Sequence, residues 1–161
     1  VGSDSDGSHL NLNSLVDPGC RIPSGASKVH GIFSDDVRGA GSFEEHMDSM
    51  RDLMDGAVIV GHNVLAFDWR FVEMECIRIG REVPQPLAIV DTLVLARSFN
   101  IPGRHKLGLL CSRFGIGLER SHSADADAGA TLLLLWKFMR EYPEKFKGSV
   151  EEVLDSIGSR L

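Results

Sequence analysis

The sequence predicts an α/β protein in which helices flank a mixed sheet, and three observations support this class. The short, continuously apolar run at 57–60 is consistent with a strand buried on both faces in a parallel sheet, and the run at 87–90 is expected to be the next strand. Longer stretches with helical spacing of apolar residues alternate with these runs along the chain. The length of 161 residues suits one domain with a hydrophobic core. We therefore expect a single domain over residues 1–161, with residues 144–161 as a C-terminal helical extension.

The first element is predicted to be a strand that follows a hairpin turn. Asp6-Gly7 is a dipeptide typical of hairpin turns. After it, apolar and polar side chains alternate over residues 9–16, the period of a strand. A hairpin needs two arms, and only Val1 to Ser5 precede the turn. We therefore expect that a strand has been cut from the front of the chain.

Paired polar residues predict where two helices begin. Ser42 with Glu45, and Ser149 with Glu152, have the spacing of capping boxes. The first box opens a helix whose methionines are spaced for burial in a core, and the second opens an amphipathic C-terminal helix. The other helices are expected over 67–79, 92–99, 107–114 and 123–140. The helix over 67–79 is expected to bury Phe67, Phe71 and Met74.

Composition and charge exclude several classes of protein. The longest apolar run, 132–136, is far shorter than the roughly 20 residues that span a bilayer. Three separated cysteines without a CxxC pair indicate reduced thiols, a cytoplasmic location and no zinc site. No G-x-G-x-x-G follows an early strand, which argues against a Rossmann-type nucleotide binder. The net charge of -6 argues against broad binding of phosphate backbones, but not against an enzyme that meets nucleic acid through bound cations.

Two aspartates are predicted at the starts of helices. Asp127 opens a strongly apolar helix, where free N–H groups and the helix dipole favour an ionised carboxylate. Asp68 follows a short apolar run at a second strand-to-helix junction. Carboxylate oxygens suit Mg²⁺, whereas His122, five residues before Asp127, suits a general base because an unperturbed histidine pKa is about 6.5. Asn63 is a candidate either for binding substrate or for holding the loop that presents Asp68.

Other polar residues have plainer interpretations. An aspartate at a helix start, taken alone, is more often a partner of the helix dipole than a metal ligand. Asp125 is expected to be solvated or capping, and Asp91 to cap the helix that follows it. The histidines at 30, 62 and 105 are expected to form hydrogen bonds in loops. Arg104 and Lys106 are candidates for contact with phosphate, with solvated surface as the equal alternative.

Four stretches, which follow one another along the chain in the family's order, resemble the DEDDh 3′–5′ exonuclease superfamily, of the type found in the epsilon subunit of bacterial DNA polymerase III. HSADADAGAT (122–131) resembles the third exonuclease motif, and GHNVLAFDWRF (61–71) resembles the second, with one extra residue. The other stretches are LVDPGCRIPSGASKVHGI (15–32) and LAIVDTLVLAR with RHKLGLLCSRFGI (87–97 and 104–116). The resemblance covers about residues 1–140 and implies a ribonuclease-H-like fold. It also implies that Asp68 and Asp127 are metal ligands and that His122 is the base.

The resemblance further implies a reaction and its partners. It indicates a 3′–5′ exonuclease that hydrolyses phosphodiester bonds at single-stranded nucleic acid ends, with DNA as the expected substrate. Two Mg²⁺ or Mn²⁺ ions would take part, and nucleoside monophosphates would be released. A DNA polymerase is a candidate partner, as in replication and proofreading.

One departure from the family pattern qualifies these expectations. The first motif of the family, an Asp-x-Glu on the opening strand, has no counterpart in the sequence, which leaves fewer carboxylates than this chemistry normally uses. We therefore expect residues 1–161 by themselves to be a fragment with little nuclease activity. The alternative is a catalytically inactive relative that acts as a binding or scaffolding module.

Overall fold

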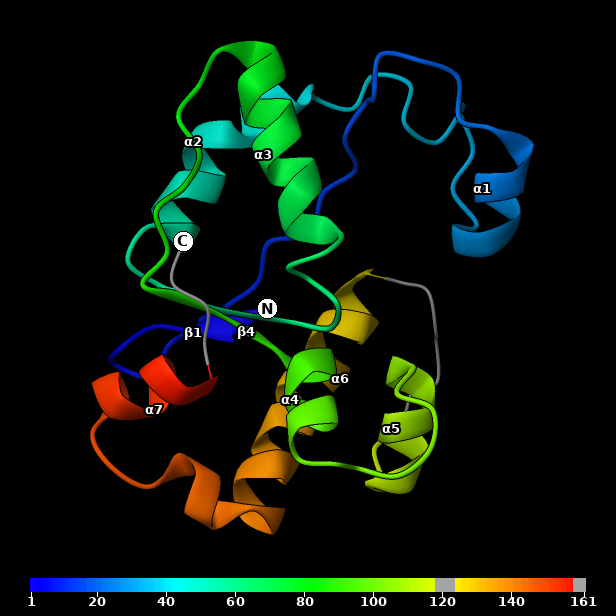
Figure 1. The fold of residues 1–161 in the computed structure, drawn as a ribbon. Coiled ribbons are helices and arrows are strands. Elements are labelled where there is room, and N and C mark those ends of the chain that lie inside the picture. The colour runs from blue at the N-terminus through cyan, green and yellow to red at the C-terminus, as the bar shows by residue number, and fades with distance from the viewer. Residues whose placement is uncertain (118–123, 158–161) are drawn as a thin grey trace.

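The computed structural model describes residues 1–117 and 124–157 of the chain (Figure 1). The strands are β1 (Gly2–Ser3), β2 (His9–Leu10), β3 (Val58–Gly61) and β4 (Ala88–Asp91). The helices are α1 (Ser24–His30), α2 (Phe43–Met54), α3 (Asp68–Ile79), α4 (Thr92–Ser98), α5 (Leu107–Arg113), α6 (Ala124–Glu141) and α7 (Val150–Ile157). A 3-10 helix, η1 (Pro143–Phe146), connects α6 to α7.

The two apolar runs form a parallel pair of strands, as the sequence predicts. β3 and β4 pair from Val58 opposite Ala88 to Gly61 opposite Asp91. Every residue of β4 is buried, whereas β3 is only partly covered and its Val58 is 40% exposed. The expectation that the run at 57–60 is buried on both faces is therefore wrong for β3. Among the described strands β3 pairs with β4 alone, which leaves its other edge without a neighbour.

The sheet separates two groups of helices. Successive side chains of a strand point to opposite faces, and β4 follows this rule, because Ala88 and Val90 join one hydrophobic cluster while Ile89 joins another. The larger cluster includes side chains of α4 to α7, and the smaller one includes Trp69 of α3. Figure 1 shows α2 and α3 beyond one side of β4, and α4, α6 and α7 beyond the other. The result is a sheet with helices on both faces.

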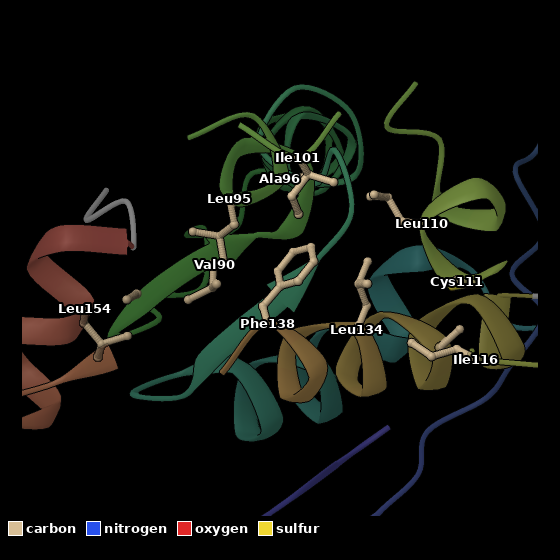
Figure 2. Close-up of a cluster of buried hydrophobic side chains, with 12 residues drawn as sticks. Val90, Leu95, Ala96, Ile101, Leu110, Cys111, Ile116, Leu134, Phe138 and Leu154 are labelled. Atoms are coloured by element: carbon tan, nitrogen blue, oxygen red, sulfur yellow. The ribbon is translucent and has the colours of Figure 1, made fainter. Parts of the chain in front are cut away.

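The larger cluster is built around α6. Figure 2 shows Leu134 and Phe138 pointing from this helix into the cluster that also contains Val90, with Leu154 of α7 at its edge. The ring of Phe138 contacts Phe99 and Phe114 edge to face, at centroid distances of 5.8 and 5.3 Å. No helix in the part of the chain that the structure describes is long and apolar enough to cross a membrane. Within the apolar run 131–136, Thr131 and Leu134 are buried, whereas Leu133 and Trp136 are 52% and 50% exposed.

The N-terminal hairpin differs from its prediction in length. The predicted turn is confirmed, with the Gly7 N–H donating to the Asp4 carbonyl at 3.2 Å and Gly7 at a φ of 88°. Gly2 and Ser3 form the first arm, antiparallel to His9 and Leu10. The predicted strand over 9–16 is wrong beyond residue 10. A strand needs a hydrogen-bonding partner, and the short first arm offers one only to its first two residues.

Both predicted capping boxes are confirmed. In the first, the Glu45 N–H donates to the Ser42 hydroxyl at 3.3 Å, and the Ser42 N–H donates to the Glu45 carboxylate at 3.2 Å. In the second, the corresponding bonds between Ser149 and Glu152 measure 3.2 and 2.8 Å. Met47 is fully buried, as its place in the methionine pattern predicts. The local sequence thus determines where α2 and α7 begin.

Helix α3 presents a different face to the core from the one predicted. Phe67, Phe71 and Met74 are exposed, and Met74 is 67% exposed. The buried side chains of α3 are Trp69 and Cys76. Cys76 lies 3.7 Å from the sulfur of Met47 on α2, while Trp69 packs in the smaller hydrophobic cluster. Apolar residues lie on both sides of this helix, so periodicity alone does not distinguish the core-facing side.

Candidate active site

The carboxyl ends of the two parallel strands lie next to each other, because Gly61 pairs with Asp91. Open α/β sheets bind ligands outside the carboxyl ends of their strands. The segment 62–67 leaves β3 at this end and leads into α3, and α4 begins directly after β4. The candidate active site is therefore expected among the loops and helix starts at this end of the sheet.

Asp91 holds the segment after β3 in place. Its carboxylate is 3% exposed and accepts hydrogen bonds from the backbone N–H groups of Asn63 at 2.8 Å, Leu65 at 3.3 Å and Leu93 at 2.9 Å. The bond from Leu93 confirms the prediction that Asp91 caps α4. The other two bonds go beyond capping. They fix the backbone around Asn63, whose φ of 63° lies in the left-handed region.

His62 connects this segment to two others. Its Nδ1 lies 2.9 Å from the Thr92 hydroxyl, and its Nε2 lies 2.9 Å from the carbonyl oxygen of His105. A carbonyl only accepts, so Nε2 carries a proton and donates it. The Thr92 hydroxyl also lies 3.1 Å from the carbonyl oxygen of Gly61. Burial lowers the pKa of His62, which favours a neutral ring. These contacts confirm His62 as a hydrogen-bonding loop histidine.

Asp68 is the first residue of α3, as predicted. The backbone N–H of Trp69 donates to the Val64 carbonyl at 2.8 Å, so the first turn of α3 is hydrogen-bonded to the segment that Asp91 holds. Burial raises the pKa of the Asp68 carboxyl, its own backbone N–H opposes this shift, and the charge of Asp91 adds to it. A carboxylate whose negative charge is disfavoured in this way would gain from a bound cation.

Asp127 lies in the first turn of α6, as predicted, and is half-buried. Its backbone carbonyl accepts a bond from the Thr131 hydroxyl at 2.7 Å. Burial and then the charge of Asp127 raise the pKa of the Cys111 thiol, which places the carboxylate near α5. Helix α6 also packs against β3. Asp125, on the same turn of α6, is exposed.

The structure thus places three of the four predicted site residues. Asn63 lies in the segment that joins β3 to α3, Asp68 is the first residue of α3, and Asp127 lies in the first turn of α6, the helix that packs against β3. His122 lies outside the described residues. Aspartate oxygens at 68 and 127 have the ligand chemistry that Mg²⁺ or Mn²⁺ requires. Within residues 1–117 and 124–157, however, no group of three or more His, Cys, Asp or Glu residues is placed to hold a metal ion.

Sequence reasoning missed two contributors to this region. Asp91 was expected only as a helix cap, because nothing in a linear sequence shows that its carboxylate also reaches Asn63 and Leu65. Arg97, in the last turn of α4, carried no sequence signal, yet its charge acts on His62. The apolar run that ends at Asp91 was the available signal, since a buried strand that ends in a carboxylate needs donors for it.

Comparisons with known proteins identify the family. The family RNase_T, described as Exonuclease, matches residues 3–135. The PolC-type DNA polymerase III of Streptococcus suis is 35% identical over 137 residues, which is 83% of this chain and 9% of that protein. The corresponding protein of Lactococcus lactis is 34% identical over 152 residues, which is 92% of this chain and 9% of that protein. The chain therefore spans only a small part of these relatives.

Solved structures show the same fold. An exonuclease I structure superimposes with a TM-score of 0.74 at 18% identity, over 88% of this chain and 36% of that one. E. coli exonuclease I in complex with a dT13 oligonucleotide gives a TM-score of 0.68 over 95% of this chain and 39% of that one, also at 18% identity. Exonuclease X in complex with 5′ overhanging duplex DNA gives 0.65 at 20% identity, over 95% of this chain and 85% of that one. The α/β architecture is thus the ribonuclease-H-like fold of these enzymes, and the chain belongs to the exonuclease family.

Proposed function

We propose that this domain is a 3′–5′ exonuclease that removes nucleoside monophosphates from single-stranded DNA with two divalent metal ions. One observation carries the proposal. Asp68 and Asp127 each lie in the first turn of a helix, one leading from the carboxyl end of β3 and the other packed against β3, in a chain of the exonuclease family. Carboxylates in the first turns of helices are suitable ligands for a divalent cation, and we propose that these two serve a common one.

Each residue then has a defined role. Asp68 and Asp127 would hold Mg²⁺ or Mn²⁺, which would supply positive charge to the scissile phosphate and a nucleophile at neutral pH. Asn63, held by Asp91, would orient the terminal nucleotide through its amide. His122 would take a proton from the attacking water, a role that rests on its position five residues before Asp127 in the sequence.

The relatives suggest the substrate and a partner. Two relatives that match most of the chain are named DNA polymerase III PolC-type, and a solved neighbour is in complex with a dT13 oligonucleotide. We therefore include single-stranded DNA as the substrate, and a DNA polymerase as a partner, in the proposal.

The test is digestion of a single-stranded oligonucleotide labelled at either end, with Mg²⁺, Mn²⁺ or a chelator. We expect metal-dependent release of mononucleotides from the 3′ end, measured with the enzyme in excess so that slow hydrolysis is detected. Asp68→Asn and Asp127→Asn should abolish hydrolysis and weaken Mn²⁺ binding. His122→Ala should slow hydrolysis by about 10²–10⁴-fold while Mn²⁺ binding is retained. Asp125→Asn is the matched control, because Asp125 is an exposed aspartate on the same turn as Asp127.

Three outcomes would contradict the proposal. Equal loss of hydrolysis in Asp125→Asn and Asp127→Asn would refute the specific role of Asp127. Release from the 5′ end would refute the direction. Tight oligonucleotide binding without any hydrolysis would instead support the alternative of an inactive binding module.

A further inference from the structure

A basic pocket lies beside Asn63, on the connection between α4 and α5. The pocket has a volume of about 710 Å³. Among its lining residues are the cations Arg97, Arg104 and Lys106, together with His62, Asn63 and His105. The pocket therefore adjoins the segment between β3 and α3 that leads to Asp68.

Within the part of the chain that the structure describes, the three cations of this pocket form no ion pair with an acidic side chain. Among the described residues that line it there is no aspartate or glutamate, and the nearby Asp91 carboxylate already accepts bonds from three backbone N–H groups. The ion pairs formed among the described residues involve other cations, and Arg97, Arg104 and Lys106 take part in none of them. The chain as a whole is acidic, with 17 basic and 23 acidic residues. Three cations gathered without acidic partners repel one another, and a bound anion would remove that repulsion.

The loop that carries two of these cations is fixed in place. The ring of His105 bonds to the carbonyl oxygen of Ile101, and the carbonyl of His105 accepts a bond from the His62 ring at 2.9 Å. Arg104 and Lys106 are the chain neighbours of His105. Both are therefore attached to a residue whose ring and backbone carbonyl are each fixed by a hydrogen bond. The bond from the His62 ring thus connects the basic loop to His62, the residue that precedes Asn63.

We propose that this pocket binds phosphate groups of the nucleic acid strand whose end occupies the candidate active site. The inference rests on the proposed function and extends it, because Asn63 belongs both to the pocket and to the site. A strand presents one negative charge per nucleotide, and arginine and lysine are the side chains that most often contact phosphate oxygens. The pocket would hold the strand through its backbone without regard to sequence, while the carboxylates act at its terminal bond.

The test is the salt dependence of binding, measured with the full chain and a fluorescent single-stranded oligothymidylate in the presence of a chelator. Each cation that contacts phosphate adds about 0.7 to the slope of log Kd against log salt for a single strand. The triple variant Arg97→Gln/Arg104→Gln/Lys106→Gln should therefore lower this slope by about two and weaken binding most at low salt. Lys28→Gln and Arg38→Gln are controls, because both residues are exposed and lie outside the pocket, and they should leave the slope unchanged.

Further arms of the experiment separate this inference from the proposed function. Arg104→Lys keeps the charge and should retain the slope. An unchanged slope in the triple variant, or failure of the parent chain to bind the oligonucleotide, would overturn the pocket assignment even where hydrolysis is normal. A lowered slope in a chain that hydrolyses nothing would support the pocket while the exonuclease proposal fails. If thymidine monophosphate binds the parent as tightly as the oligonucleotide and depends on the same cations, the pocket serves free nucleotide and not the strand.

Discussion

At the scale of single residues, Asp68 shows opposing electrostatic effects. Its place in the first turn of α3 favours a negative charge, because free backbone N–H groups surround it. Burial and the charge of Asp91 disfavour the same charge, and together they raise the pKa of the Asp68 carboxyl. In the absence of a cation the charged form is therefore less favourable in the folded chain than in the unfolded one.

This shift predicts how stability depends on pH. A raised pKa means that the folded chain binds the proton more tightly, so the contribution of Asp68 to stability is complete below the unfolded pKa of 3.8 and is lost as the pH rises through the folded value. The Asp68→Asn substitution removes the titrating carboxyl, and with it this loss of stability at higher pH. We expect the variant to be more stable than the parent at pH 7, by no more than about 0.5 kcal/mol, because the Asp68 carboxyl is only partly desolvated and the solvent that reaches this residue screens its charge.

The measurement is thermal melting of both proteins at pH 7 and near pH 3, with a chelator present. The difference in Tm should vanish at the lower pH, where Asp68 is protonated in both the folded and the unfolded chain. Added Mn²⁺ should raise the Tm of the parent more than that of Asp68→Asn, because only the parent offers the charged ligand. A parent that stays more stable than the variant at pH 7 without metal would show that the pKa shift has the opposite sign.

At the scale of elements, the candidate site depends on how β4 is joined to the segment after β3. Three backbone N–H groups, from two different elements, donate to the Asp91 carboxylate. His62 adds bonds to Thr92 at the start of α4 and to the loop before α5. The segment that carries Asn63 and leads to Asp68 is therefore held by side chains and not by regular secondary structure.

Asp91→Asn should loosen this segment. An amide keeps one accepting oxygen and replaces the other with a donor, so at least one of the three backbone N–H groups loses its partner inside the protein. Leaving a buried donor unsatisfied costs about 1–3 kcal/mol. We expect a lower urea midpoint by a corresponding amount, followed through tryptophan fluorescence, and weaker oligonucleotide binding under conditions where the variant remains folded.

Asp52→Asn provides the control for this experiment. Asp52 is an exposed residue of α2, and its substitution should change the free energy of unfolding by less than about 0.5 kcal/mol. Equal stability of the two variants would mean that the Asp91 bonds contribute nothing to the folded state. A destabilised Asp91→Asn protein with parental oligonucleotide binding would mean that the segment it holds does not position substrate.

At the scale of the whole molecule, the C-terminal helix belongs to the main core. Leu154 of α7 is 7% exposed and lies in the same hydrophobic cluster as Val90 and Phe138 (Figure 2). Helix α7 also packs against β4, the strand that ends at Asp91. The segment predicted as a helical extension therefore contributes to the support of the strand that positions the candidate site.

Leu154→Ala should destabilise the folded chain by about 2–4 kcal/mol, because it removes buried apolar surface and leaves a cavity. Val150→Ala, on the same helix, is the comparison. Val150 is 69% exposed, so its loss should cost less than about 0.5 kcal/mol. Chemical denaturation of both variants measures the difference. Similar midpoints would show that α7 packs on the core in the structure without contributing to its stability.

The fold was largely predictable where local rules decide it. Both capping boxes form as their sequences predict, and both apolar runs pair as parallel strands. The wrong face of α3 and the overlong first strand have physical explanations. Helix α3 carries apolar side chains on both of its sides, so the side that faces the core depends on where α2 and β4 lie. The first strand ends where its partner ends, which no pattern within residues 9–16 reveals.

The sequence by itself determined the positions of Asp68 and Asp127 at helix starts, because capping, apolar runs and motif spacing are local properties of the chain. Only the tertiary structure decided which side chains hold that site together. The bonds that Asp91 accepts from Asn63 and Leu65 join residues 28 and 26 positions apart, and the bond from His62 to the carbonyl of His105 joins residues 43 positions apart. The tertiary structure also brings Arg97, Arg104 and Lys106 together around one pocket, since contacts between distant segments form only when the sheet and its helices pack.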